Sequence, residues 1–201
     1  MWRFIFPALP FIVSLTGALP AVHAAAAAWE ALKFHKTPAP LAADAKTEDW
    51  PRFLGPHDAP VSRETQIRQD VPESGPPLIW ECAKGSGYAC PVVAGGKLVL
   101  FHRVKGKETL DCLDPETGKR FWSYAYPVEY TDDFGYSDGP RAAPVMTGGR
   151  VFSFGITSQL KCVDLTTGTV VWEVDCEKNT TFPNISSAPD PRPWCKMDSS
   201  S

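Results

Sequence analysis

The chain has 201 residues, 20 of them proline, and a formal net charge of −3. Globular proteins ordinarily contain ~5% proline, and this chain contains roughly twice that fraction. The composition therefore argues against a mainly helical protein. The charge is mild, and the lysines and arginines are scattered along the chain, so the sequence does not indicate binding to nucleic acid or to an anionic membrane surface.

The first 24 residues have the pattern of a secretory signal peptide. Arg3 and the amino terminus form a positive start, residues 4–19 are an apolar run, and residues 22–24 offer small side chains for cleavage. A membrane span is the alternative, but Pro7 and Pro10 interrupt a run already short of the ~20 residues required. The sequence therefore predicts an exported protein, periplasmic or secreted, with no membrane span after signal removal.

Residues 25–48 predict a flexible leader, with a short helix near residues 29–34, because they are rich in alanine, lysine and proline. Residues 49–175 form the predicted repeat region, which opens with Trp50 and Phe53 on a proline-stiffened chain. These two aromatic side chains are predicted to anchor the segment to the folded region, and stacking on a ligand is the alternative. Farther along, residues 78–81 predict a strand without neighbours nearby in sequence.

Two stretches, residues 110–124 and 160–174, repeat the pattern Asp-x-x-Thr-Gly-x-x-x-Trp at an offset of 50 residues (164 minus 114). Upstream of each lies an Ala-x-Pro-Val-x-x-Gly-Gly segment. A period near 50 residues made of short strands predicts a radial β-repeat. The repeated structural positions are Asp114, Gly118 and Trp122 in the first copy, and Asp164, Gly168 and Trp172 in the second.

The second copy predicts four strands, at residues 143–146, 150–156, 159–164 and 169–175. One such antiparallel unit cannot bury a face alone, and stacking units around an axis solves the problem. The predicted fold class is therefore all-β, a partial β-propeller of four-stranded antiparallel blades after the signal peptide.

This repeat resembles the quinoprotein, or pyrroloquinoline-quinone (PQQ), type of β-propeller repeat over about two blades. The resemblance implies that Trp122 and Trp172 dock between neighbouring blades. It also implies that residues 78–81 are the fourth strand of a blade whose other strands lie at the far carboxyl end of a longer chain.

The number of blades and the tail bear on whether the chain is complete. A propeller has at least four blades, and the pattern fails in residues 176–201, which predict an irregular tail. The sequence favours a truncated or frame-shifted product, and a short protein that assembles with copies of itself is the alternative.

Six cysteines in an exported chain are compatible with disulfides. Cys82 and Cys90 flank a loop with two glycines, so they are the candidate disulfide, with free thiols as the alternative. Cys112 and Cys162 are expected to pack as small apolar groups in the third strands. The four histidines are dispersed and no Cys-x-x-Cys occurs, so no metal site is predicted.

The link between the two copies, residues 125–141, is predicted to form the ligand face, because long loops often carry function. Asp132 and Asp133 either supply oxygen ligands for calcium or belong to a solvated acidic loop. Arg141 either clamps a carboxylate of a ligand or forms a structural ion pair. The candidate residues of this face are Asp132, Asp133, Tyr136, Asp138 and Arg141.

Two functions are compatible with these patterns. The first is an exported binding or scaffold module with a protein or glycan partner in the cell envelope. The alternative, implied by the resemblance, is a PQQ-dependent dehydrogenase of the alcohol type, with PQQ and calcium on the axis of a complete homologue. An adjacent Cys-Cys pair, typical of that enzyme class, is missing. No catalytic residue is assigned, and no residue pattern by itself identifies a bound cofactor.

Overall fold

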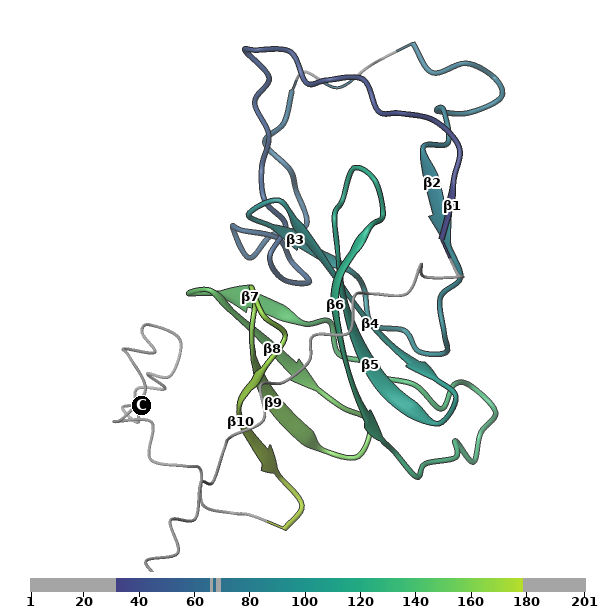
Figure 1. Cartoon of the computed structure of the whole chain (residues 1–201), viewed down its shortest axis with the longest axis vertical. Helices are drawn as coiled ribbons and strands as arrows, with labels where there is room; N and C mark the ends of the chain where they lie inside the picture. The colour runs from purple at the N-terminus through teal and green to yellow at the C-terminus, as the bar shows by residue number, and fades with distance from the viewer. Residues whose placement is uncertain (1–31, 66, 68–69, 179–201) are drawn as a thin grey trace, which may run out of the picture.

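The computed structural model describes residues 32–65, 67 and 70–178 of the chain (Figure 1). All ten strands that it contains lie in antiparallel sheets, two of four strands and one of two. The described part of the chain includes no helix with the length and hydropathy needed to cross a bilayer. The predicted signal peptide and residues 179–201 of the predicted tail lie outside the described residues.

The first four-stranded sheet is a meander in which each strand pairs with the next along the chain. Tight glycine turns join β3 to β4 and β4 to β5, with positive φ at Gly95, Gly96 and Gly106. The long pairing of β4, β5 and β6 forms most of the sheet. The strands are β3 (Val92–Ala94), β4 (Lys97–Val104), β5 (Lys107–Leu113) and β6 (Arg120–Pro127).

The second sheet repeats the same meander and confirms the four strands predicted for the second copy. Its first strand begins two residues later than predicted and its second ends two residues earlier. The third strand has the predicted bounds, and the fourth begins one residue later than predicted. The strands are β7 (Val145–Thr147), β8 (Arg150–Phe154), β9 (Gln159–Asp164) and β10 (Val170–Asp175).

The Asp-x-x-Thr-Gly motif forms the turn between the third and fourth strands of each sheet. The Asp164 carboxylate accepts the backbone N–H groups of Thr166 and Thr167, both at 3.0 Å, and the N–H of Thr167 holds the pKa of Asp164 below its usual range. Gly168 closes the turn at φ +74°, a conformation that favours glycine. Asp114 and Gly118 build the same turn in the first sheet.

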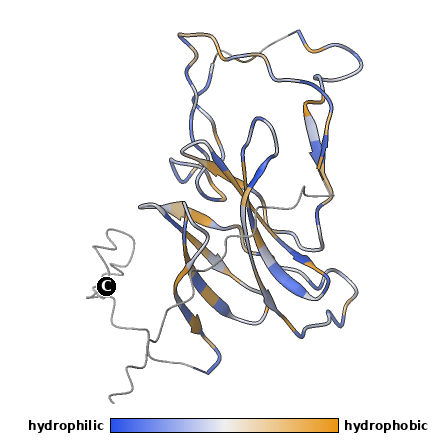
Figure 2. Cartoon of the chain, in the orientation of Figure 1, coloured by the Kyte–Doolittle hydropathy of each residue, from blue (hydrophilic) through white to orange (hydrophobic). Residues whose placement is uncertain are grey.

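The core lies between the facing surfaces of the two sheets (Figures 1 and 2). Side chains alternate along each strand, so every second residue faces the neighbouring sheet. The fully buried members Phe101 and Leu110 come from the first sheet, and Val151 and Val163 come from the second. The buried hydrophobic cluster contains Ala89, Val92, Val99, Phe101, Leu110, Cys112, Met146, Val151 and Val163.

The fourth-strand tryptophan of the first sheet crosses to the second sheet. The Trp122 indole N–H donates to the Leu165 carbonyl over 2.9 Å. Its ring covers Gly168 so closely that a Cβ there would lie 2.7 Å from the ring. The docking implied for Trp122 is therefore confirmed. Trp172 lies beside Phe152, with ring centroids 6.0 Å apart, and no further sheet follows it among the described residues.

The strand predicted at residues 78–81 forms as β2 (Trp80–Cys82) and has a partner that the sequence did not predict. Among the described residues it pairs with β1 (Leu32–Phe34) in a two-stranded sheet. The helix predicted near residues 29–34 is wrong for its described part, residues 32–34, which are extended. Leu32 and Trp80 both pack over Gly118, so burial of these two side chains favours the strand.

Trp50 is the anchor of the N-terminal segment. Its backbone makes two hydrogen bonds with Val93 of β3, at 2.7 and 2.9 Å, and the next carbonyl, of Pro51, accepts the N–H of Met146 in β7. The segment thus ties together the first strands of both sheets. Phe53 is 65% exposed, so its predicted anchoring role is wrong. The chain turns at residues 52–55 and places Gly55, not Phe53, under the Trp50 ring.

Cys82 and Cys90 are both free thiols, so the candidate disulfide is absent. The loop between them is fixed to other parts of the molecule, because Ser86 bridges Arg103 and the Tyr88 N–H donates to the Pro140 carbonyl. Cys112 and Cys162 are buried as predicted.

Candidate functional site

The link between the sheets folds back against the end of β4, where Arg103 holds it. The Arg103 guanidinium donates to three link carbonyls: Val128 at 2.8 Å, Tyr130 at 2.7 Å and Asp138 at 3.0 Å. Arg103 shares a sheet face with Val99 and Phe101, and its side chain is 14% exposed. Arg103 was not among the predicted site residues, although an arginine alternating with apolar residues in a strand is a detectable signal.

Asp132 is the hydrogen-bonding centre of the link. Its side chain is only 4% exposed, and one carboxylate oxygen accepts the N–H groups of Phe134 at 3.2 Å and Tyr136 at 2.7 Å. The other oxygen accepts the Arg141 guanidinium at 2.5 Å. The Asp132 N–H in turn donates to the Asp138 carboxylate at 2.7 Å. The structure thus brings four of the five predicted residues together, and they hold one another.

This arrangement does not fit calcium. Both Asp132 oxygens already accept hydrogen bonds, and the Arg141 cation occupies the place of a metal ion. Among the residues that the structure describes, no group of three or more His, Cys, Asp or Glu side chains is arranged to hold a metal. Asp132 is buried rather than solvated, Asp133 is exposed, and Arg141 forms the structural ion pair that was one of its two predicted roles.

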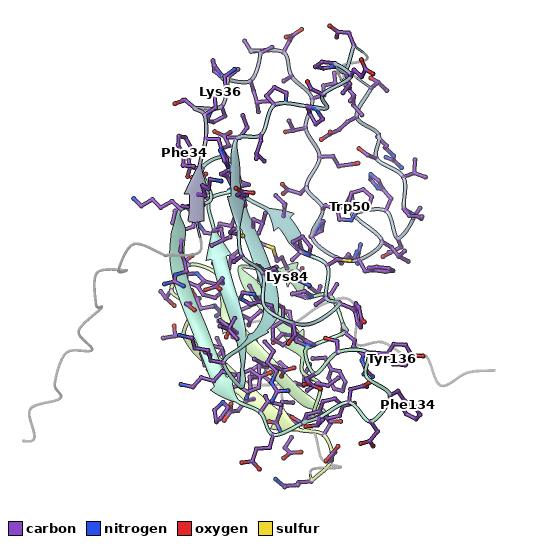
Figure 3. All side chains as sticks on the ribbon, turned by 90° about the vertical axis from the view of Figure 1, so that its right-hand side faces the viewer. Phe34, Lys36, Trp50, Lys84, Phe134 and Tyr136 are labelled. Carbon is purple, nitrogen blue, oxygen red and sulfur yellow. The ribbon has the colours of Figure 1, made fainter. Side chains whose placement is uncertain are left out.

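The order imposed by Arg103 and Asp132 contrasts with the exposure of the aromatic side chains that the link carries. Phe134 is 84% exposed and Tyr136 is 72% exposed, and both project from the molecule in Figure 3. Tyr88, 57% exposed, joins them from the adjacent loop and donates its hydroxyl to the Tyr136 carbonyl at 3.2 Å. We call Tyr88, Phe134 and Tyr136 the aromatic loop face. Of the three, only Tyr136 was predicted from the sequence.

The loop that carries Tyr88 packs tightly against the link. Tyr88 and Ala89 both donate their N–H groups to the Pro140 carbonyl, at 2.8 and 3.0 Å. A Cβ on Gly139 would lie 2.2 Å from the Ser86 carbonyl oxygen, so only glycine permits this approach. The aromatic loop face is therefore built from two loops that are fixed to each other.

Acidification is expected to loosen the aromatic loop face. The backbone N–H of Tyr136, together with the Arg141 guanidinium, holds the pKa of Asp132 below its usual range and outweighs the opposing effect of burial. The resulting stabilisation is complete above the unfolded pKa of about 3.9 and is lost as the pH falls through the lower folded pKa. The measurement is the NMR shift of the Phe134 and Tyr136 amides between pH 6 and pH 2.

The control for this pH dependence is Asp132→Asn, which cannot ionise. In this variant the Phe134 and Tyr136 amides are expected to lack the transition that depends on Asp132. A wild-type transition that persists in Asp132→Asn would assign the effect to another group.

Residues 106–189, which include β5 to β10, match the model described as outer membrane protein assembly factor BamB. The chain carries a partial PQQ-type β-propeller repeat. The predicted all-β fold with four-stranded antiparallel blades is confirmed, and the two four-stranded sheets are blades of this repeat. No curated protein matches the chain.

Solved structures with similarity to this PQQ-type repeat include enzymes and an assembly factor. Quinohemoprotein alcohol dehydrogenase from Comamonas testosteroni is 22% identical at a TM-score of 0.43, covering 66% of this chain and 20% of that one. A europium-containing methanol dehydrogenase is 19% identical at 0.37, covering 46% and 16%. BamB from Moraxella catarrhalis is 23% identical at 0.29, covering 45% and 23%. The match thus spans less than a quarter of each of these proteins.

Proposed function

We propose that this protein is an exported binding or scaffold module of the cell envelope, which binds a protein or glycan partner through the aromatic loop face. The observation that carries the proposal is the combination of exposed aromatic rings with a fixed backbone. Three large rings lie in solvent, while Arg103 and Asp132 hold the link that carries two of them.

A fixed backbone lowers the free-energy cost of binding. Ordering a loop during association costs free energy, so a loop that is already ordered binds with less loss. Aromatic and arginine side chains dominate the binding energy of protein interfaces, and aromatic rings also stack on sugar rings. The half-exposed Arg141 adds a cation to the same link, because its guanidinium is held at Asp132 with 47% of the side chain accessible.

A PQQ-dependent dehydrogenase is the second candidate. This chemistry needs a hard cation beside the quinone, whereas one Asp132 oxygen accepts the Tyr136 N–H and the other pairs with Arg141. Trp50 and Pro51 also cover backbone groups of β3 and β7, the first strands of the two blades. These observations support the binding module over the enzyme.

The experiment that tests the binding module is photocrosslinking in the envelope of the source cells. A benzophenone amino acid replaces Phe134 in the full chain, and a second version carries it at Phe53, which is 65% exposed on a different loop. We expect one discrete protein or glycan adduct from position 134, none from position 53, and loss of the position-134 adduct when Asp132→Asn loosens the loop. Equal labelling from both positions, or none, would overturn the proposal.

The enzyme alternative has its own readout. Purified protein is mixed with PQQ and calcium, and both the absorbance of the quinone and the reduction of an artificial electron acceptor by an alcohol are measured. We expect neither a shifted quinone spectrum nor dye reduction. Turnover that depends on added PQQ would replace the binding module with the dehydrogenase.

A further inference from the structure

A cavity lies on the face of the first blade that is turned away from the second blade. Its lining includes His102 and Asp111, which directly follow the core residues Phe101 and Leu110 in β4 and β5. Because neighbours in a strand point to opposite faces, His102 and Asp111 lie on the side away from the core. The volume of the cavity is about 530 Å³, which falls within the ~300–1,000 Å³ range of small-molecule sites.

Four cationic side chains line this cavity. One comes from the loop before β3, two flank the glycine of the turn between β4 and β5, and one begins β6. The first and the last are 36 residues apart (120 minus 84), so the fold gathers charges that are scattered along the chain. They are Lys84, Lys105, Lys107 and Arg120.

The positive charge of the cavity is only partly compensated. Among the described residues that line it, Asp111 alone is a carboxylate. One Asp111 oxygen accepts the Nε2–H of His102 at 2.9 Å, and the other accepts the Arg120 guanidinium at 3.4 Å. Within the described part of the chain, no ion pair involves any of the three lysines. The cavity therefore carries an excess of three positive charges.

The loop that carries Lys84 is fixed against the buried His102. The next residue, Gly85, donates its N–H to His102 Nδ1 at 2.9 Å. Since Nδ1 accepts this bond, the ring proton lies on Nε2, where it is donated to Asp111. A Cβ on Gly85 would lie 2.1 Å from the Arg103 carbonyl oxygen, so only glycine permits this approach. His102 thus positions one wall of the cavity.

The turn that carries Lys105 and Lys107 is fixed as well. The Val128 N–H donates to the carbonyl of Gly106, between the two lysines, at 3.0 Å. Lys105 has φ +48°, a conformation that is uncommon for residues other than glycine. The backbone on both sides of the cavity is therefore ordered before a ligand arrives, which lowers the cost of binding.

We propose that this cavity binds a phosphate group, as the free ion or on a small sugar. Lysine binds phosphate as a point charge, and a dianion offsets the mutual repulsion of the excess cations. The hydroxyl-bearing side chains of Thr109 and Ser123 also line the cavity and suit the polar groups of a sugar. No lining residue belongs to the aromatic loop face, so the inference goes beyond the proposed function.

The test is an NMR titration of the full chain at about pH 8, where phosphate and its monoesters are mainly dianions. Inorganic phosphate and glucose 6-phosphate are added separately at constant ionic strength, with glucose and sodium chloride as blanks. The reporters are the amides of Gly85 and Gly106, one on each wall. We expect saturable shifts with a phosphate ligand and none with the blanks. Tighter binding of glucose 6-phosphate assigns the cavity to the ester, and tighter binding of inorganic phosphate assigns it to the free ion.

Substitutions separate the cavity from general charge effects. Lys105→Asn/Lys107→Met removes two of the three lysines, with asparagine chosen because it tolerates positive φ. It is expected to weaken binding by roughly tenfold or more. Lys105→Arg/Lys107→Arg keeps the charge and is expected to bind within about threefold of the wild type. Lys84→Met tests the opposite wall independently and is expected to weaken binding by about threefold or more.

Lys36→Met/Lys119→Met is the matched control, because it removes the same charge from two exposed lysines that do not line the cavity. Figure 3 shows Lys36 apart from Lys84, on the N-terminal segment. This control is expected to bind like the wild type. The absence of saturable shifts with both phosphate ligands, or equal weakening in the control and in the cavity variants, would overturn the proposal. If Lys105→Asn/Lys107→Met does not fold, unweakened binding by Lys84→Met has the same consequence.

Discussion

Replacing Gly168 with alanine is expected to lower the free energy of unfolding by about 2–5 kcal/mol, the sum of backbone strain and overpacking. Gly168 has φ +74°, where an L side chain is strained, and the new Cβ would lie 2.7 Å from the Trp122 ring. The ring cannot simply withdraw, because its indole N–H is bound to the Leu165 carbonyl. The measurement is equilibrium urea unfolding.

Gly149→Ala is the matched control for this substitution. Gly149 has φ +71°, nearly the same conformation, but a Cβ added there would have no heavy atom within 4 Å beyond its chain neighbours. Only the strain of about 1 kcal/mol is therefore expected there. An equal loss at both glycines would show that contact with Trp122 adds nothing to the stability of the two blades.

Replacing Arg103 with methionine is expected to cost about 2–4 kcal/mol and to release the link between the blades. Hydrogen bonds from a charged donor contribute roughly 1.5–3 kcal/mol each, and Arg103 makes three of them to link carbonyls. Once the link opens, water can hydrogen-bond to the freed carbonyls and offset part of the lost free energy. Urea unfolding reports the stability, and hydrogen exchange of residues 128–141 reports the release.

The control for Arg103 is Arg52→Met. Arg52 pairs with Asp58 and donates to the carbonyls of Gly55 and Pro56, all within its own turn. Because its side chain is 40% exposed and none of these partners belongs to the link, its loss is expected to cost less than the loss of Arg103. In that variant the link should keep its protection from exchange. Full protection of the link in Arg103→Met would show that Asp132 alone orders it.

The blades could be predicted because their signals are local. Each Asp-x-x-Thr-Gly turn is closed by bonds within five residues, as for Asp164 and Gly168. The alternation of buried and exposed side chains likewise follows from the two-residue period of a strand. The repeat strengthened the prediction, since the same pattern occurs at a second place in the chain.

The candidate site was predicted only in part. The sequence predicted the link, Asp132 and Arg141 as candidate site residues. It did not predict that Asp132 and Arg141 stabilise the link through hydrogen bonds within it. Arg103 was missed because its three partners lie 25 to 35 residues away along the chain. The exposure of Phe134 was also not predictable, because residue type alone does not say whether a ring in a loop faces the core or the solvent.

The sequence by itself determined the all-β fold, the four-strand unit and the turns that bound it, because these depend on residues close to one another in the chain. Only the tertiary structure decided that β1 pairs with β2 and that the buried Asp132 forms an ion pair with Arg141. It also decided that Trp80 and Trp122 pack over the glycines of the two turns. Each of these contacts joins residues that are separated along the chain but adjacent in space. Their free energy comes from burying side chains and satisfying hydrogen bonds once the blades have packed together.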